Sequence, residues 1–322
     1  MFESRIDLTE LKTAVEAIRS EIGKVIIGQQ QPFDLLLTAL LADGHVLIEG
    51  VPGVAKTLLA KLLAKTISIE FSRIQFTPDL MPSDVLGTSV YNPKQADFEY
   101  RTGPVFANIV LIDEINRAPA KTQAALFEVM EERQVTADGT TRRLAEPFLV
   151  LATQNPVEQE GTYRLPEAQL DRFLFKIIMG YPSAEEEVDI LRGHHERRSL
   201  TDALEAVQSV LTADQLTALR AQVHRVHVED HLFAYMAQIV QSTRANKSLY
   251  LGASPRASVA LLNGAKALAT LRGRDFVTPE DVQELAAPVL RHRIILTPER
   301  EMEGGTADEV IAEVVRKIEV PR

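Results

Sequence analysis

The sequence contains no cysteine. Disulfides and thiolate metal sites are therefore excluded, and the composition is compatible with a reducing compartment. Long apolar runs are also missing, because the most apolar stretches, such as "DLLLTALLAD", are too short to span a bilayer. The first residues, "MFESRIDLTEL", lack the positive region and apolar run of a secretory signal. Together these absences predict a cytoplasmic protein with no membrane insertion.

Positive charge is scarce relative to negative charge. The 35 lysines and arginines face 45 aspartates and glutamates, so the formal net charge is −10. Binding to a nucleic-acid backbone without regard to sequence is therefore disfavoured, although a local basic patch is compatible with this balance. Hydrophobic residues make up 45% and charged residues 25%, the profile of a folded globular protein. A length of 322 residues suits about two domains.

Five short apolar runs in the first half of the chain are separated by helical or loop stretches. Continuous apolar strands that alternate with helices indicate a parallel sheet covered on both faces. The sequence therefore predicts an α/β fold with a parallel sheet flanked by helices. The predicted strands are "HVLIE" (45–49), "RIQF" (73–76), "NIVLID" (108–113), "FLVLAT" (148–153) and "FLFKII" (173–178).

Two intervals between these strands do not look like simple crossovers. Residues 85–106 contain Asn-Pro and Thr-Gly-Pro turn signals with aromatic residues between them, which indicates a hairpin-like insertion. Residues 133–148 place Asp138 and Gly139 between two short extended arms, a strong hairpin signal. We expect two hairpins that either contact a substrate or are solvated decoration.

The second half of the chain has a helical pattern. Pro182 ends the strand region, and Ser183 with Glu186 opens a helix as a capping box. We therefore expect an α/β domain over residues 1–181 and a smaller all-helical lid domain over residues 182–322. Other helix starts are expected at Asp7 with Glu10, at Pro32 (a helix to Ala42), at Thr212 with Gln215, at Ser254 with Pro255, and at Thr278 with Pro279.

A phosphate-binding pattern, "GVPGVAKT", lies between the first predicted strand and a helix. Such a turn aims backbone N–H groups at a phosphate, and the helix N-terminus adds positive potential. Lys56 would reach the β- and γ-phosphates of ATP, and the Thr57 hydroxyl would ligate Mg²⁺. The alternative is a capped strand–helix turn with a solvent-exposed lysine. The predicted nucleotide-contacting residues are Gly50, Val51, Pro52, Gly53, Val54, Ala55, Lys56, Thr57 and Leu58.

Alanine stands where the pattern G-x-x-x-x-G-K-[ST] has its second glycine. Gly50 and Gly53 leave room for the loop to turn and for the backbone to approach a phosphate. We expect Ala55 to be the first residue of the helical turn, where φ is negative and a methyl group fits. On that expectation the departure from the pattern is tolerable.

Polar side chains follow two of the predicted strands. "NIVLIDEINRA" ends in Asp113 and Glu114; Asp113 can hold Mg²⁺, and Glu114 can polarise the attacking water. The alternative is an ordinary solvated carboxylate pair, but its position after a phosphate loop favours catalysis. "FLVLATQNP" ends with Asn155, whose carboxamide can orient a water and contact the terminal phosphate. The alternative for Asn155 is a turn or helix-capping asparagine before Pro156.

Longer blocks accompany these motifs: "LIDEINRAPAKTQAALFEVMEERQVT", "LATQNPVEQEGTYRLPEAQLDRFLF" and "GASPRA". With "GVPGVAKT", they resemble the MoxR family of AAA+ ATPases over nearly the whole chain. The alanine before Lys56 is common in that family. The two predicted hairpins are similar to the insertions of the helix-2-insert branch of AAA+ proteins. The resemblance implies that Lys56 and Thr57 belong to Walker A, Asp113 and Glu114 to Walker B, and Asn155 to sensor 1.

The same resemblance implies roles for two arginines. Arg172, in "LDRF", matches the arginine that such proteins present to the nucleotide of a neighbouring subunit. Arg256, in "SPRA", matches sensor 2, acting within its own subunit or across the interface. A cation in the first turn of a helix needs a nearby anion. A nucleotide phosphate would serve for Arg256, and a local glutamate is the alternative. The alternative for Arg172 is a surface salt bridge.

The resemblance implies an ATP- and Mg²⁺-dependent ring oligomer, a hexamer, with a chaperone-like role. That role would be the maturation of protein complexes or the insertion of metals, and the partners would carry von Willebrand factor A domains. Two other functions stay open. One is a DNA-acting motor, which the acidic balance disfavours. The other is a scaffold that binds ATP without turnover, which Glu114 and Arg172 disfavour.

Overall fold

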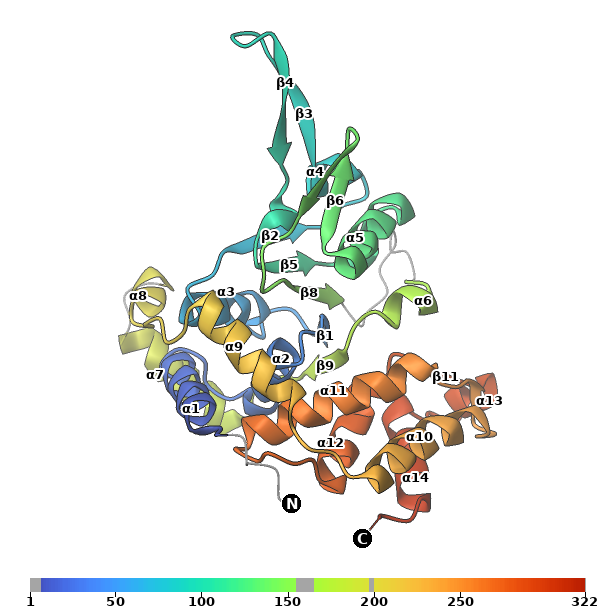
Figure 1. The fold of residues 1–322 in the computed structure, drawn as a ribbon. Coiled ribbons are helices and arrows are strands. Elements are labelled where there is room, and N and C mark those ends of the chain that lie inside the picture. Colours follow the sequence, from blue (N-terminus) through green and yellow to red (C-terminus); the bar gives the residue numbers. More distant parts are fainter. Residues whose placement is uncertain (1–6, 155–164, 197–199, 322) are drawn as a thin grey trace.

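The computed structural model describes residues 7–154, 165–196 and 200–321. Its centre is a parallel sheet with helices on both faces (Figure 1). Each strand overlaps one of the five predicted apolar runs, so the predicted α/β fold is confirmed. In spatial order the strands are β2 (Phe71–Gln75), β5 (Ile109–Asp113), β8 (Leu149–Gln154), β1 (Val46–Gly50) and β9 (Phe175–Met179).

Alternate residues of each strand pack on opposite faces of the sheet. In β5, Ile109 and Leu111 belong to one apolar core, whereas Val110 and Ile112 belong to the other. All five β5 residues are buried, which explains why the first four, Ile109 to Ile112, are continuously apolar. The first core contains α1 (Thr9–Gly23), α2 (Gln30–Leu41), α3 (Lys56–Thr66) and α11 (Pro255–Leu271), and the second contains α5 (Ala120–Glu132).

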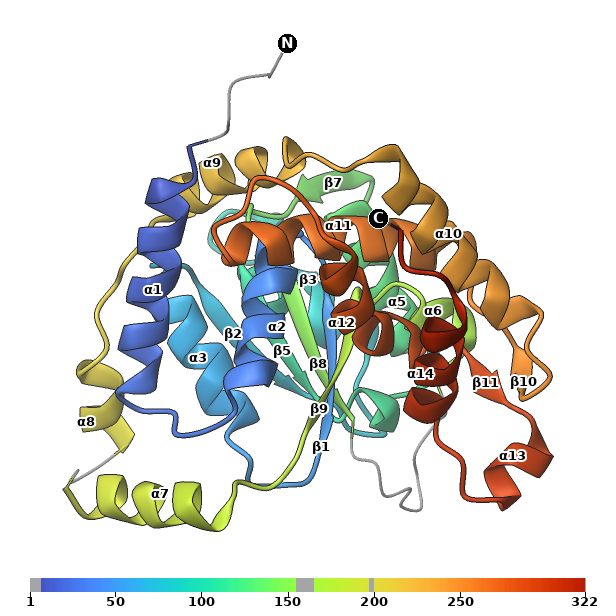
Figure 2. The same ribbon diagram turned by 90° about the horizontal axis from the view of Figure 1, so that it is seen from below.

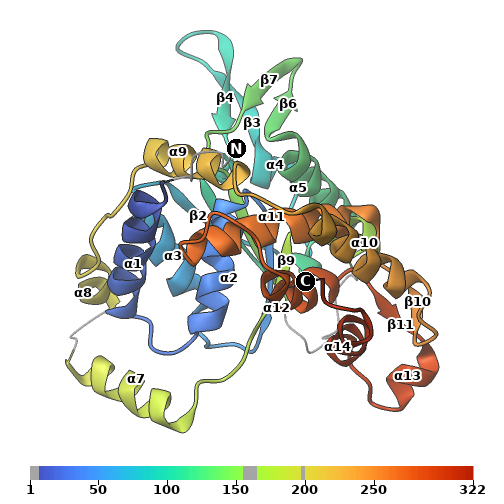
Figure 3. The same ribbon diagram turned by 60° about the horizontal axis from the view of Figure 1, so that its bottom comes forward.

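Two antiparallel hairpins extend from the same side of the sheet (Figures 1 and 3). The first pairs β3 (Gly87–Asn92) with β4 (Asp97–Thr102), and the second pairs β6 (Gln134–Ala137) with β7 (Thr140–Arg143). Asp138 and Gly139 join β6 to β7 with φ of 52° and 71°, as a tight hairpin turn requires. Both predicted hairpins are confirmed.

Helices form most of the chain after β9. Ser183 and Glu186 exchange the hydrogen bonds of a capping box, as predicted, with 2.8 and 3.2 Å between the paired atoms. The apolar core of the sheet continues into this part through α11, so no break in packing separates it from the sheet. Its helices are α7 (Ala184–Glu196), α8 (Leu200–Glu205), α9 (Ala213–His224), α10 (Asp230–Arg244), α11, α12 (Pro279–Leu290), α13 (Pro298–Met302) and α14 (Ala307–Lys317).

The structure corrects two local predictions. Helix α1 begins at Thr9 rather than at a capping box of Asp7 and Glu10, because the Asp7 carboxylate accepts the Thr9 N–H at 3.0 Å from outside the helix. The helical second half also contains a small antiparallel sheet of β10 (Leu249–Leu251) and β11 (Ile295–Leu296). Strands this short leave no periodic signal in the sequence. Among the described helices, none is long and apolar enough to cross a membrane.

Candidate nucleotide-binding site

The phosphate loop lies between the end of β1 and the start of α3, as predicted. Its two glycines are needed for different reasons. A Cβ on Gly50 would lie 2.6 Å from the backbone oxygen of Met179 on the neighbouring strand, so any side chain there would collide. Gly53 has open space around it but adopts φ of +87°, which other residues rarely do. The loop therefore leaves its backbone accessible beside the first turn of α3.

Ala55 contradicts the expectation of a negative φ. It is the N-cap of α3 and adopts a left-handed conformation, with φ of 60° and ψ of 22°. The helical turn begins one residue later, at Lys56, so position 55 still belongs to the loop. Alanine there carries a steric cost that glycine would avoid, because its Cβ approaches the following carbonyl oxygen.

Ala55→Gly is therefore expected to stabilise the protein. Relief of the left-handed alanine outweighs the extra freedom that glycine gains in the unfolded chain, and we expect a gain in unfolding free energy of roughly 0.5–1 kcal/mol. Urea denaturation of the variant and the wild type measures the difference. A lower midpoint for Ala55→Gly would contradict the assigned backbone conformation. Ala42→Gly, at a helix C-cap with φ of −79°, is the matched control and should destabilise.

Lys56 is the first residue of α3 and is partly buried. Its ammonium group donates to the Gly50 carbonyl oxygen at 2.7 Å, across the loop. Burial lowers the pKa of Lys56, and the carboxylates of Asp113 and Glu114 raise it by less. Lys56 and Thr57 open the helix after β1, and Asp113 and Glu114 lie at the end of β5, so all four residues belong to the carboxyl edge of the sheet.

Asp113 is the last residue of β5 and is buried. One carboxylate oxygen accepts the Thr153 hydroxyl at 3.2 Å, and the other accepts Arg73 Nε at 2.6 Å. The Thr153 hydroxyl also accepts the backbone N–H of Glu114 at 3.0 Å, so one side chain fixes both acidic residues. The sequence analysis missed Thr153, although its place at the end of a buried strand beside β5 was a usable signal.

Glu114 adopts a left-handed conformation with φ of 57°, directly after the strand. A non-glycine residue held in this region costs free energy and commonly marks a functional position. The turn redirects the Glu114 carboxylate, which accepts Gln75 Nε2 at 3.0 Å and lies 3.1 Å from Arg117 Nε. The carboxylate is thus held in a fixed direction at the carboxyl edge of the sheet.

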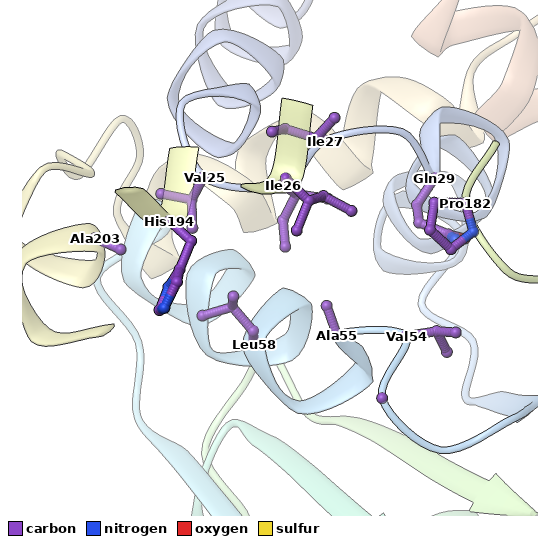
Figure 4. Close-up of a pocket in the computed structure, with 12 residues that line it drawn as sticks. Val25, Ile26, Ile27, Gln29, Val54, Ala55, Leu58, Pro182, His194 and Ala203 are labelled. Carbon is purple, nitrogen blue, oxygen red and sulfur yellow. The ribbon is translucent and has the colours of Figure 1, made fainter. Parts of the chain in front are cut away.

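An apolar cavity of about 340 Å³ adjoins the phosphate loop (Figure 4). Its volume is near the lower end of those that hold small ligands. The segment between α1 and α2 forms one wall, and α7 contributes Ile190 and His194. The sequence analysis missed this wall because its apolar residues have no motif spacing. The lining residues are Val25, Ile26, Ile27, Gln29, Gly53, Val54, Ala55, Leu58, Pro182, Ile190, His194 and Ala203.

Two oxygen donors at this edge, the Thr57 hydroxyl and the Asp113 carboxylate, suit Mg²⁺. Magnesium is usually held by one or two carboxylates together with substrate phosphates and waters, and not by an all-protein cage. The described part of the chain contains no group of three or more His, Asp or Glu side chains that could hold a metal. The donors present therefore fit a magnesium–nucleotide complex. Asn155 lies outside the described residues.

Arg172 and Arg256 lie together, but away from Lys56. Arg172 precedes β9, whose first residue pairs with the first residue of β1, whereas Lys56 follows the last residue of β1. The length of a strand, about 16 Å for five residues, therefore separates the two ends. In Figure 2, the loop after β1 and helix α7 lie at one end of the strands. Helix α11, which has Arg256 in its first turn, crosses the other end of the strands.

Each arginine pairs with an acidic side chain of its own chain. Arg172 Nε lies 3.7 Å from one carboxylate oxygen of Glu131, and Arg256 Nη2 lies 3.2 Å from the other. Arg172 also donates to the Phe127 carbonyl oxygen. Within one chain, therefore, Arg172 makes the surface salt bridge given above as its alternative role, and Arg256 pairs with a local glutamate. The structure brings Lys56, Thr57, Asp113 and Glu114 to one edge of the sheet and this pair to the other.

Known proteins resemble this chain over most of its length. Residues 45–175 match the ATPase family associated with various cellular activities (AAA), and residues 241–314 match the AAA lid domain. The chaperone MoxR1 of Mycobacterium tuberculosis is 46% identical over 95% of this chain and 80% of its own length. The protein YeaC of Bacillus subtilis is 51% identical over 93% of this chain and 92% of its own length.

A solved structure has the same fold. A candidate ATPase from Cytophaga hutchinsonii aligns with a TM-score of 0.90 and 43% sequence identity, over 98% of this chain and 97% of its own. The likeness therefore covers the sheet, both hairpins and the helices that follow β9.

Proposed function

The chain belongs to the MoxR family of AAA+ ATPases, and we propose that it hydrolyses ATP with Mg²⁺ in a hexameric ring that remodels protein complexes. One observation carries the proposal. Lys56, which donates to the last residue of β1, and Asp113 and Glu114, at the end of β5, lie at the carboxyl edge of the parallel sheet, where only β8 separates the two strands. A glycine-containing loop and an apolar cavity adjoin this edge. Nucleotides bind at this edge in open α/β sheets.

In the proposed reaction each residue has a separate task. The loop backbone and Lys56 bind the β- and γ-phosphates, with Lys56 leaving the Gly50 carbonyl oxygen to do so. Thr57 and Asp113 would hold Mg²⁺, which when bound neutralises charge on the phosphate oxygens. Glu114 orients the attacking water and takes its proton, and Gln75 and Arg117 keep its carboxylate in place.

The cavity beside the loop would take the adenine base. Its lining is mostly aliphatic, which suits the faces of a purine, and Gln29 and His194 supply polar groups at the wall. Since α7 forms part of this wall, bound nucleotide would contact both the sheet and the helical part of the chain. Hydrolysis could then change the angle between the proposed domains, residues 1–181 and 182–322.

Lys56→Ala is expected to raise the dissociation constant for ATP by roughly a hundredfold, because a charge-assisted contact to two phosphates is worth about 3 kcal/mol. Isothermal titration with ATP and Mg²⁺ measures the change. Lys61→Ala is the matched control, since Lys61 lies on the same helix but over the Phe71 ring, 5.9 Å from its centre. Equal affinity in Lys56→Ala and wild type would contradict the phosphate-binding role.

The hairpin of β3 and β4 would contact the protein client. Tyr91 and Phe98 form an edge-to-face pair with 5.5 Å between ring centres, yet they are 52% and 68% exposed. Exposed aromatic pairs of this kind are typical of protein contacts. Partners with von Willebrand factor A domains, and a role in complex maturation or metal insertion, are proposed on the family resemblance alone.

Turnover of ATP tests the proposed function directly. Phosphate release by the wild type should require Mg²⁺ and stop with a chelator. Affinity capture on Glu114→Gln in the presence of ATP should then retain client proteins. Retention of DNA by the protein at physiological salt would instead favour the DNA-acting motor, which the net charge of −10 disfavours.

A further inference from the structure

Glu131 is the one acidic side chain that contacts both Arg172 and Arg256 among the described residues. We propose that Glu131 is a positioning residue, which holds these two guanidinium groups side by side for the nucleotide of a neighbouring subunit. This inference rests on the proposed function. Glu131 would thus take part in turnover from the end of the sheet opposite to the phosphate loop.

The local electrostatics of the two helices make this contact unusual. Glu131 is in the last turn of α5, where the negative end of the helix dipole disfavours an anion. Arg256 is in the first turn of α11, where the positive end disfavours a cation. Each charge is unfavourable for its own helix, and the 3.2 Å pair offsets both. The helix dipole therefore does not explain why an acidic residue stands at position 131 or a basic residue at position 256.

The contacts with Glu131 leave part of each guanidinium group available. Arg172 uses Nε and Nη1, and Arg256 uses Nη2, so among the described residues Arg172 Nη2 and Arg256 Nη1 donate no hydrogen bond. The Arg256 side chain is 55% exposed and that of Arg172 is 29% exposed. Both can thus donate to a phosphate from outside the chain while Glu131 orients them and reduces their mutual repulsion.

The backbone on either side of this pair is fixed by a second contact. Asp171, next to Arg172, accepts the Ser254 hydroxyl at 2.7 Å and Arg293 Nε at 2.7 Å. Ser254 is the N-cap of α11, two residues before Arg256, and Arg293 is buried. Because both ends of the pair are anchored, loss of the Glu131 carboxylate should disturb the directions of the arginine side chains more than the fold.

Glu131→Gln tests this role. We expect kcat for ATP to fall between about tenfold and a hundredfold, as misplacement of catalytic groups does, with the affinity for ATP unchanged. Glu128→Gln is the matched control, because Glu128 is exposed on the same helix and makes no ion pair within the described part of the chain. Thermal melting of both variants should match that of the wild type. A normal kcat in Glu131→Gln would overturn the proposal.

Mixed rings distinguish positioning across the interface from a defect inside the subunit. Lys56→Ala subunits bind ATP weakly but present intact arginines. At an ATP concentration that leaves their own sites largely empty, mixing them with Glu131→Gln subunits should give more turnover than the two separate samples combined. No recovery in the mixture would overturn the proposal, because the defect would then belong to the subunit's own site. Absence of turnover in the wild type would instead refute the proposed function, and this inference with it.

Discussion

Glu114→Gln is expected to lower kcat for ATP hydrolysis by roughly a hundred- to ten-thousandfold, the usual worth of a general base. The amide has nearly the shape of the carboxylate, but it cannot take a proton from water. Its oxygen can still accept from Gln75, so the left-handed turn at position 114 should persist. The affinity for ATP should stay within a few fold of the wild type, and titration with ATP beside steady-state phosphate release separates the two quantities.

The same variant decides between an enzyme and a scaffold. A scaffold would give equal and negligible phosphate release in wild type and Glu114→Gln, whereas the proposed enzyme loses nearly all of its release. Glu132→Gln is a suitable control, since Glu132 is exposed at the end of α5 and its carboxylate accepts a hydrogen bond from Gln134 Nε2. A Glu114→Gln protein with normal turnover would contradict the role of Glu114.

Arg172→Ala is expected to lower kcat by about a thousandfold or more, the usual worth of an arginine supplied to phosphoryl transfer from a neighbouring molecule. ATP affinity should be unchanged, because Arg172 lies a strand's length from the phosphate loop of its own chain. Turnover per subunit of the wild type should therefore rise with protein concentration as rings assemble. Phosphate release measured over a concentration series, with light scattering for the assembled state, provides the test.

Arg225→Ala is the control for this substitution, because Arg225 is an exposed arginine at the end of α9. It removes the same charge and should leave kcat unchanged. Normal turnover by Arg172→Ala in the assembled state would contradict its proposed role across the interface. Turnover of the wild type that does not depend on concentration below the assembly range would contradict the requirement for a neighbour.

The sheet and the hairpins could be predicted because their signals are local. Buried parallel strands must be apolar on both faces, so β5 and β8 appear as continuous apolar runs. The turn at Asp138 and Gly139 needs positive φ at both positions, which few residue pairs allow. The predicted helix starts at Thr212 and Ser254 are confirmed for the same reason, since the N-cap side chain bonds within its own turn.

The rest of the site depends on contacts between residues far apart in sequence. Glu131 meets Arg256 across 125 positions, and no spacing rule links them. The wall of the cavity joins the segment before α2 to α7, which only the folded chain brings together. The expectation of a negative φ at Ala55 was wrong because the helix was expected to begin at Ala55, whereas it begins at Lys56 and Ala55 is still part of the loop, in a left-handed conformation. The path of the backbone through the loop, and not the preference of alanine, determines φ at this position.

A crystal structure of Glu114→Gln grown with ATP and Mg²⁺ tests the central claim most directly. The account predicts a triphosphate along the loop from Gly50 to Thr57, with the Lys56 ammonium on the β- and γ-phosphates. It predicts the metal between the Thr57 hydroxyl and the Asp113 carboxylate, and the adenine in the cavity beside Leu58. Nucleotide bound elsewhere, or phosphates out of reach of Lys56 and Asp113, would contradict it.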